Sequence, residues 1–191
     1  MFTFYRLALS AMLIGLVALA QPAPLSGQNP VEAAPSPPES QDLTVFLVRH
    51  AEKERGPEVG KDPQLTEAGR ARAAALATTL SEVDVDAIYV TQWRRTRETA
   101  APLAERLGLE PVVVSTDPPD FIGRMAELLK SRPGRTVVVV GHSDTTPELA
   151  RALGAEAAPD IADNDFDDLY QVHAGSGSRL FLHLRFGHPT P

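Results

Sequence analysis

LTVFLVRH, residues 43–50, is the stretch of the sequence that decides the fold. Its first six residues are apolar or β-branched and the run is too short for a helix, so it predicts a strand buried on both faces of a parallel sheet. A second run, TVVVV at residues 136–140, has the same character. Both runs lead within two residues to a histidine, His50 after the first and His142 after the second.

The segments between and after these runs alternate between strand-like and helical patterns. VDAIYV at residues 85–90 and PVVVS at residues 111–115 are strand-like. Helices are expected from the capping residue Thr66 to about Leu80, over residues 95–107 before Gly108, and over about 120–129 and 147–153. This alternation predicts an α/β fold with three layers, α/β/α, built on a mainly parallel sheet with right-handed crossovers.

The C-terminal part of the sequence predicts two further strands. One covers residues 169–172, and the other is RLFLHLRF at residues 179–186. In the second run Leu180, Leu182, Leu184 and Phe186 alternate with more polar neighbours. That alternation is typical of an antiparallel strand at the edge of a sheet.

Composition limits the class of protein. The 191 residues include 18 Lys and Arg against 25 Asp and Glu, a formal net charge of −7, and 43% of them are hydrophobic. This apolar content suits one compact domain and is too high for a disordered chain. We expect no nucleic-acid partner, because the chain is acidic and has no basic block. The absence of cysteine excludes disulfides, thiolate metal sites and a cysteine nucleophile.

The N-terminus has the pattern of a secretory signal peptide. Arg6 precedes a charge-free apolar run at residues 7–20, which ends in the small-x-small triplet Ala18-Leu19-Ala20. This run is shorter than the ~20 residues that span a bilayer, so we expect residues 1–20 to be a signal peptide cleaved after Ala20. An uncleaved anchor is the alternative. The expected location is periplasmic or secreted, with no stable membrane insertion after cleavage.

A proline-rich linker follows, at residues 21–41, where six of the 17 prolines lie. Proline at this density removes backbone donors and fixes φ, so neither a helix nor a central strand is expected. The folded domain is therefore predicted at residues 42–191. The oligomeric state is left open.

Four side chains are candidates for an anion site. Ligands of open α/β sheets bind outside the carboxyl ends of the strands, which is where His50 and His142 follow the two most apolar runs. Arg49 adjoins the first histidine, and Arg95 lies at the start of a predicted helix. A guanidinium fork at a helix start favours anion binding, so these four residues predict a cationic pocket for a dianion.

These residues belong to a pattern that resembles the histidine phosphatase, or phosphoglycerate-mutase-like, superfamily. The resemblance rests on RHAEK at residues 49–53, LTEAGR at 65–70, the segment around Arg95 with Thr99-Ala100, and GHS at 141–143. The four pieces follow the family's order and span about residues 43–155. Four pieces in order are more specific than any one short motif.

The resemblance implies covalent phosphoryl transfer in two steps. His50 would attack phosphorus as a neutral imidazole, and water would then hydrolyse the phosphohistidine. Arg49, Arg95 and a protonated or donating His142 would bind the phosphoryl oxygens and stabilise their charge. This design needs no metal or other cofactor, and the expected partner is a small phosphorylated substrate.

The proton donor for the leaving group is left open. In the acid-phosphatase branch an Asp directly follows the second histidine, but here Ser143 stands there and Asp144 is one residue further on. The mutase branch takes a Glu from the preceding segment, which here offers Asp117 and Asp120 and no mutase motif. The donor is therefore one of these three aspartates, or there is none and only good leaving groups react. Residual mutase activity also stays open.

Substrate selection is predicted to come from the loop at residues 54–64, with Lys53 and Lys61, although simple solvation explains both lysines equally well. The sequence does not name the substrate.

Two other functions compete. GHSDT at residues 141–145 approaches the Gly-x-Ser-x-Gly elbow of α/β hydrolases, with Asp163 or Asp165 and His173 or His183 as partners of Ser143. The last glycine of the elbow is missing, and this hypothesis leaves Arg49, His50 and Arg95 unexplained. The other alternative is an exported protein that binds a phosphorylated ligand in the same pocket without turnover.

Overall fold

The computed structural model describes residues 42–117, 119–132, 134–175 and 179–190. The predicted signal peptide and linker, residues 1–41, lie outside the described residues. Within the described part, none of the helices has the length and apolar character needed to cross a membrane.

One mixed sheet forms the centre of the fold, with six strands in the order β3-β2-β4-β1-β5-β6. The strands are β1 Leu43–Arg49, β2 Ala87–Val90, β3 Val112–Val113, β4 Thr136–Gly141, β5 Asp168–Ala174 and β6 Arg179–Arg185. β1, β2, β3 and β4 pair in parallel, whereas β5 is antiparallel to β1 and β6 is antiparallel to β5. The mainly parallel sheet and the antiparallel C-terminal strands predicted from the sequence are confirmed.

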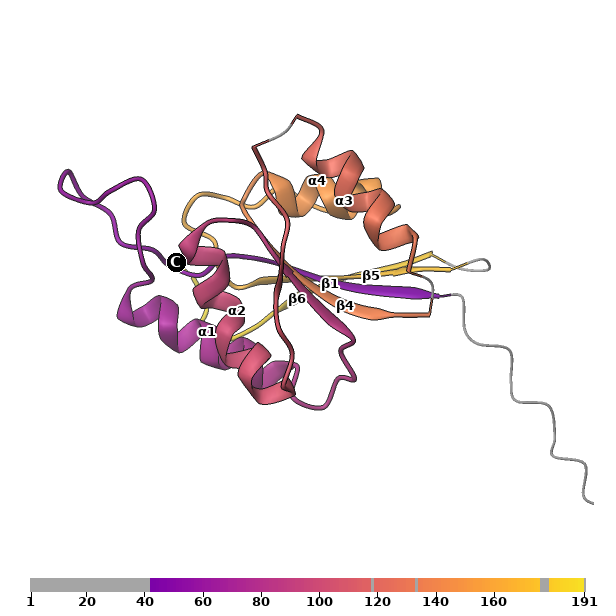
Figure 1. Ribbon diagram of the computed structural model, residues 1–191, viewed down its shortest axis with the longest axis horizontal. Helices are drawn as coiled ribbons and strands as arrows, with labels where there is room; N and C mark the ends of the chain where they lie inside the picture. Colours follow the sequence, from indigo (N-terminus) through magenta and orange to yellow (C-terminus); the bar gives the residue numbers. More distant parts are fainter. Residues whose placement is uncertain (1–41, 118, 133, 176–178, 191) are drawn as a thin grey trace, which may run out of the picture. The chain divides into compact units, whose positions relative to one another are not determined.

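Helices cover both faces of this sheet, which confirms the three-layer α/β/α architecture. The helices are α1 Glu67–Thr79, α2 Arg94–Leu107, α3 Phe121–Lys130 and α4 Thr145–Ala152. In Figure 1, α1 and α2 lie on one side of the sheet, and α3 and α4 lie on the other. Successive β1 side chains alternate between the two cores: Val45 and Leu47 pack with α3 and α4, and Phe46 and Val48 pack with α1 and α2. Burial on both faces explains the unbroken apolar runs of β1 and β4.

The loop after β1 is fixed on the start of α1. The backbone N–H of Thr66, the N-cap of α1, donates to Glu52 O at 2.9 Å. A Cβ atom added to Gly69 would lie 2.2 Å from the same oxygen. Only glycine allows this approach. The residues that follow His50 are therefore held against a helix.

Several strands and helices begin or end at residues other than those predicted. The strand expected at 111–115 is only Val112–Val113, at the sheet edge and exposed. β2 begins at Ala87 instead of Val85, because Asp86 accepts the N–H of Thr136 through its carboxylate. α4 begins at Thr145 instead of Pro147. Proline is tolerated in the first turn of a helix, because a backbone N–H at that position would have no helical partner.

β6 is an edge strand as predicted, and its leucine face is open. Leu180, Leu182 and Leu184 are 48%, 38% and 40% exposed, whereas Phe186 is 4% exposed and packs in the core on the α1 and α2 side. Only the end of β6 is covered.

Candidate active site

The structure brings the two predicted histidines together at the carboxyl ends of neighbouring parallel strands. Arg49 at the end of β1 pairs with Gly141 at the end of β4, and the His50 N–H donates to Gly141 O at 2.9 Å. The ring centroids of His50 and His142 are 5.4 Å apart. This proximity follows from the parallel register, because both histidines stand one residue beyond their strands.

A cavity of about 410 Å³ lies at this edge of the sheet. All four candidate side chains line it: Arg49, His50, Arg95 and His142. The rest of its lining consists of Lys53, Trp93, Thr116, Ser143, Asp144 and Thr145. The sequence prediction of one shared pocket for two histidines and two arginines agrees with this geometry.

The His50 ring is oriented for nucleophilic attack through one nitrogen. Its Nδ1 lies 2.8 Å from the carbonyl oxygen of Ala51, and the residue is only 4% exposed. A carbonyl only accepts hydrogen bonds, so Nδ1 carries the hydrogen of the neutral ring and Nε2 keeps its lone pair. Burial lowers the pKa of His50 to about 3, and the neighbouring His142, Arg95 and Arg49 lower it as well. The nucleophilic form is therefore the stable one.

His142 is also neutral, with the opposite tautomer. Arg95 Nη2 lies 3.4 Å from His142 Nδ1, and a guanidinium only donates, so Nδ1 accepts. The hydrogen then sits on Nε2, which is 3.1 Å from Thr91 Oγ1. Burial and then Arg95 lower the pKa of His142 to about 4. Of the two forms expected from the sequence, protonated or donating, the structure favours a neutral ring whose one N–H is directed to Thr91.

Arg49 is held from the far side of the cavity. The residue is 5% exposed, and its Nη1 donates to Ala162 O at 2.7 Å and to Asp165 O at 2.9 Å. Its guanidinium lies 4.2 Å from the centroid of the Phe166 ring. Its buried Nε has no hydrogen-bond partner in the described residues. A buried donor without a partner is costly in a folded protein unless a ligand or water satisfies it.

Arg95 also has a buried donor that the described residues leave without a partner. It stands in the first turn of α2, and its guanidinium lies 4.8 Å from the centroid of Trp93. Its Nε is also buried without a partner among the described residues. Two buried guanidinium donors left over in one cavity suit an oxyanion.

The segment that holds Arg49 is itself tied to the C-terminal tail. Arg185 Nη1 donates to Asp165 Oδ1 at 2.8 Å and to Asp167 Oδ1 at 2.6 Å. Thr190 Oγ1 lies 2.8 and 2.7 Å from the same two oxygens, and its one hydrogen is donated to either of them. The position of Arg49 therefore depends on contacts more than 110 residues away along the chain.

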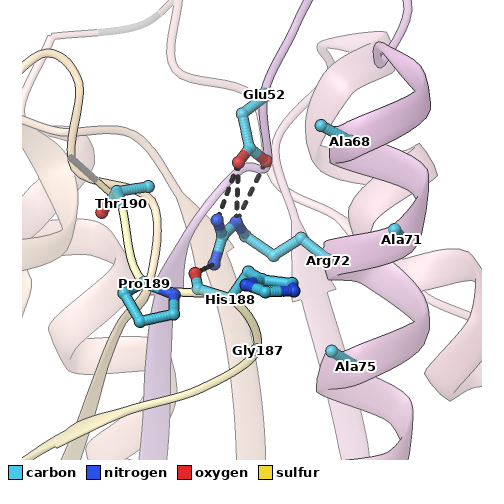
Figure 2. A pocket seen from close by; sticks show the side chains of 9 residues that line it. All are labelled: Glu52, Ala68, Ala71, Arg72, Ala75, Gly187, His188, Pro189 and Thr190. Carbon is cyan, nitrogen blue, oxygen red and sulfur yellow. Dashed lines mark hydrogen bonds and ion pairs between the residues drawn. The ribbon is translucent and has the colours of Figure 1, made fainter.

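A second clamp fixes the loop after His50. Figure 2 shows the Glu52 carboxylate facing the Arg72 guanidinium, with Nη2 and Oε1 2.8 Å apart, beside a cavity of about 500 Å³. Arg72 Nη1 also donates to Phe186 O and His188 O, so this guanidinium joins the loop, α1 and the C-terminal tail. On the α2 side, Ala51 N–H donates to Thr99 Oγ1 at 2.9 Å.

The three candidate proton donors from the sequence do not all line the cavity that contains the histidines. Asp117 and Asp120 line a neighbouring cavity of about 520 Å³ and not the one that contains the histidines. Asp120 caps α3 by accepting the Gly123 N–H. Asp144 lines both cavities and caps α4, with its Oδ1 2.7 Å from the Thr145 N–H.

The side chains that a serine hydrolase would need do not lie together in the structure. Ser143 lines the histidine cavity, but neither His173 nor His183 does. His173 contacts Thr44, and His183 bonds Asp168. The remote histidines that Ser143 would need are therefore engaged elsewhere.

Two contacts of the site were not singled out in the sequence. Thr91, which orients His142, is buried and directly follows β2. That position beyond a parallel strand was a usable signal. Phe166, under Arg49, carried no such signal, because it lies in an irregular segment.

The lowered histidine pKa values predict that both rings stay neutral at about pH 5, because an unperturbed histidine titrates near 6.5. In the unfolded chain both rings protonate below about pH 6.5, so the free energy of unfolding should fall as the pH drops from there toward the folded values. Ring-nitrogen NMR measures the titration of each ring, and urea unfolding at about pH 6.5 and about pH 5 measures the free energy of unfolding. A titration midpoint near 6.5 for either ring in the folded protein contradicts it.

Comparison with known proteins places this geometry in a family. Residues 45–117 match the model of the Histidine phosphatase superfamily (branch 1). This match and the site geometry support placing the chain in the histidine phosphatase superfamily. The matched residues include Arg49, His50 and Arg95.

Curated relatives are similar to this chain over part of their length. Phosphoserine phosphatase 1 of Hydrogenobacter thermophilus is 42% identical over 75 residues, which are 37% of this chain and 35% of that protein. This chain thus spans about a third of the length of the relative it matches.

Solved structures share the fold over most of the domain. Putative phosphohistidine phosphatase SixA from Agrobacterium tumefaciens superposes with a TM-score of 0.59 at 21% identity, covering 76% of this chain and 97% of that one. A mycobacterial glucosyl-3-phosphoglycerate phosphatase gives a TM-score of 0.57 at 19% identity, covering 75% and 98%. At these identities the likeness concerns the fold.

Proposed function

We propose that this histidine phosphatase hydrolyses phosphomonoesters through a phosphohistidine on His50. The observation that carries the proposal is the pairing of a neutral imidazole, free at Nε2, with two buried arginine Nε groups that have no protein partner. The first is a nucleophile, and the others are donors for an oxyanion. Family membership and the named phosphatase relatives support it.

The reaction has two steps. His50 Nε2 attacks phosphorus, the ester P–O bond breaks, and its electron pair stays on the leaving oxygen. Arg49 and Arg95 meet the charge on the equatorial oxygens, where preorganised donors lower the barrier most. Water then attacks phosphorus, the P–N bond breaks, and phosphate leaves with His50 restored. A neutral nucleophile avoids charge repulsion with the phosphate dianion.

The proposal includes independence from metal ions. In the described residues no group of three or more His, Asp or Glu side chains is placed to hold a metal ion. The two arginines supply the positive charge and donors that a metal would otherwise provide.

Export remains part of the proposal and rests on residues 1–20 and the proline-rich linker alone. The mature domain would begin after Ala20 and act on a small phosphorylated substrate outside the cytoplasm.

Hydrolysis of a panel of phosphomonoesters by the domain should persist unchanged in EDTA. Phosphate release is measured by a colorimetric assay, before and after chelation and dialysis. Activity that disappears with EDTA and returns with a divalent ion contradicts metal independence. Stoichiometric binding of the same esters without any phosphate release contradicts hydrolysis and favours a binding protein.

A further inference from the structure

Lys53 is a cation that the described chain leaves without a counter-ion. It lines the histidine cavity, three residues after His50, and its backbone pairs with Leu65 in an isolated antiparallel bridge. No ion pair in the described residues joins Lys53 to a carboxylate. Its two acidic neighbours are engaged: Glu52 binds Arg72, and Glu54 Oε1 accepts Gln64 Nε2 at 2.7 Å.

The charges that shift the pKa of Lys53 are all positive. Partial burial lowers its pKa, and so do Arg95, Arg55 and Arg49. An uncompensated ammonium among three guanidinium groups is unfavourable unless an anion joins them. A phosphate ester in the cavity supplies that anion, so Lys53 and the substrate stabilise each other.

The other polar groups of the cavity are poor proton donors to a leaving alkoxide. Guanidinium groups do not give up protons in proteins, which removes Arg49 and Arg95. The neutral His142 directs its one N–H to Thr91.

Asp144 caps α4, where its Oδ1 is engaged as the acceptor of the Thr145 N–H. Alcohol side chains and the Trp93 indole are too weakly acidic. An ammonium with a lowered pKa carries a proton and can release it.

We propose, on the basis of the phosphohistidine reaction proposed above, that Lys53 is the general acid and base of this enzyme. As His50 Nε2 bonds to phosphorus and the ester P–O bond breaks, Nζ gives one proton to the leaving oxygen, which departs as an alcohol. The neutral amine then takes a proton from the water that attacks the phosphohistidine. Phosphate leaves, and Lys53 is an ammonium again.

Leaving-group dependence tests this role. We expect Lys53→Met to lower kcat/KM for a simple alkyl phosphate by about 10²- to 10⁴-fold, the usual contribution of a general acid. p-Nitrophenyl phosphate has a leaving group that needs no proton, so its kcat/KM, which reports the phosphorylation of His50, should change far less. Lys53→Arg keeps the charge without the transferable proton, so it should restore KM but not kcat for the alkyl ester. Lys61→Met is the matched control, because Lys61 does not line the cavity.

Each other outcome overturns the proposal. Equal losses of kcat/KM on the two esters make Lys53 a phosphate ligand only, and unchanged values of kcat and kcat/KM remove it from the reaction. Wild-type protein that hydrolyses neither ester overturns the phosphatase function and the role of Lys53 with it. If the wild-type protein is active and Lys53→Met shows the same leaving-group dependence, only the proposed role of Lys53 is overturned. Thermal unfolding of each variant confirms that it is folded.

Discussion

His50→Ala is expected to lower kcat by roughly 10³- to 10⁶-fold, the range seen when a covalent nucleophile is removed. The methyl group offers no lone pair to phosphorus, while Arg49 and Arg95 remain to bind substrate. The loss should therefore appear in kcat more than in KM. Steady-state hydrolysis of p-nitrophenyl phosphate measures both constants.

The control for this variant is His188→Ala, since His188 is exposed in the C-terminal tail and does not line the cavity. It should keep wild-type activity. Added imidazole should restore part of the activity of His50→Ala by entering the space of the missing ring. Wild-type turnover in His50→Ala would remove this residue from the chemistry.

Arg49→Met is expected to lower kcat/KM by about 10²- to 10³-fold, the cost of losing one preorganised donor at a developing oxyanion. Arg49→Lys should recover little of it. A lysine lacks the planar fork by which one nitrogen anchors to Ala162 O and Asp165 O while the same guanidinium lines the cavity. Binding of orthovanadate, which mimics the five-coordinate phosphorus, should weaken in parallel.

Arg97→Met is the matched control for Arg49, because Arg97 is exposed on α2 and does not line the cavity. Equal effects of the two substitutions would mean that bulk positive charge matters and the anchored guanidinium does not. Unchanged kcat/KM in Arg49→Met would contradict its place in the site.

The parts of the site that rest on regular strands could be predicted from the sequence. The apolar runs of β1 and β4 are continuous because both faces of these strands are buried. Parallel pairing of two such strands brings the residues beyond their ends together, which places His50 beside His142. Arg95 follows in the same way, because α2 begins beyond the end of β2.

The parts that rest on long-range contacts between irregular segments could not be predicted. The carbonyl groups that hold Arg49 come from a loop more than 110 residues later, and a carbonyl oxygen has no sequence signature. The same holds for the proton donor. Asp117 and Asp120 follow β3 in sequence, but they line a separate cavity, which leaves Asp144 and Lys53 in the one that contains the histidines.

The open leucine face of β6 also escaped prediction. Alternating leucines indicate that one face of a strand is apolar, but they do not say which neighbouring element covers that face. Here Leu180, Leu182 and Leu184 remain exposed, and only Phe186 at the end of the run enters the core.

Trapping the phosphorylated enzyme tests the central claim most directly. The domain is mixed with excess p-nitrophenyl phosphate, stopped with base within the first turnovers, digested and examined by mass spectrometry. We expect one phosphate on the peptide that contains His50, stable in base, lost in acid and absent from His50→Ala. Turnover with no phosphate on His50, or a base-labile phosphate on Ser143, contradicts it.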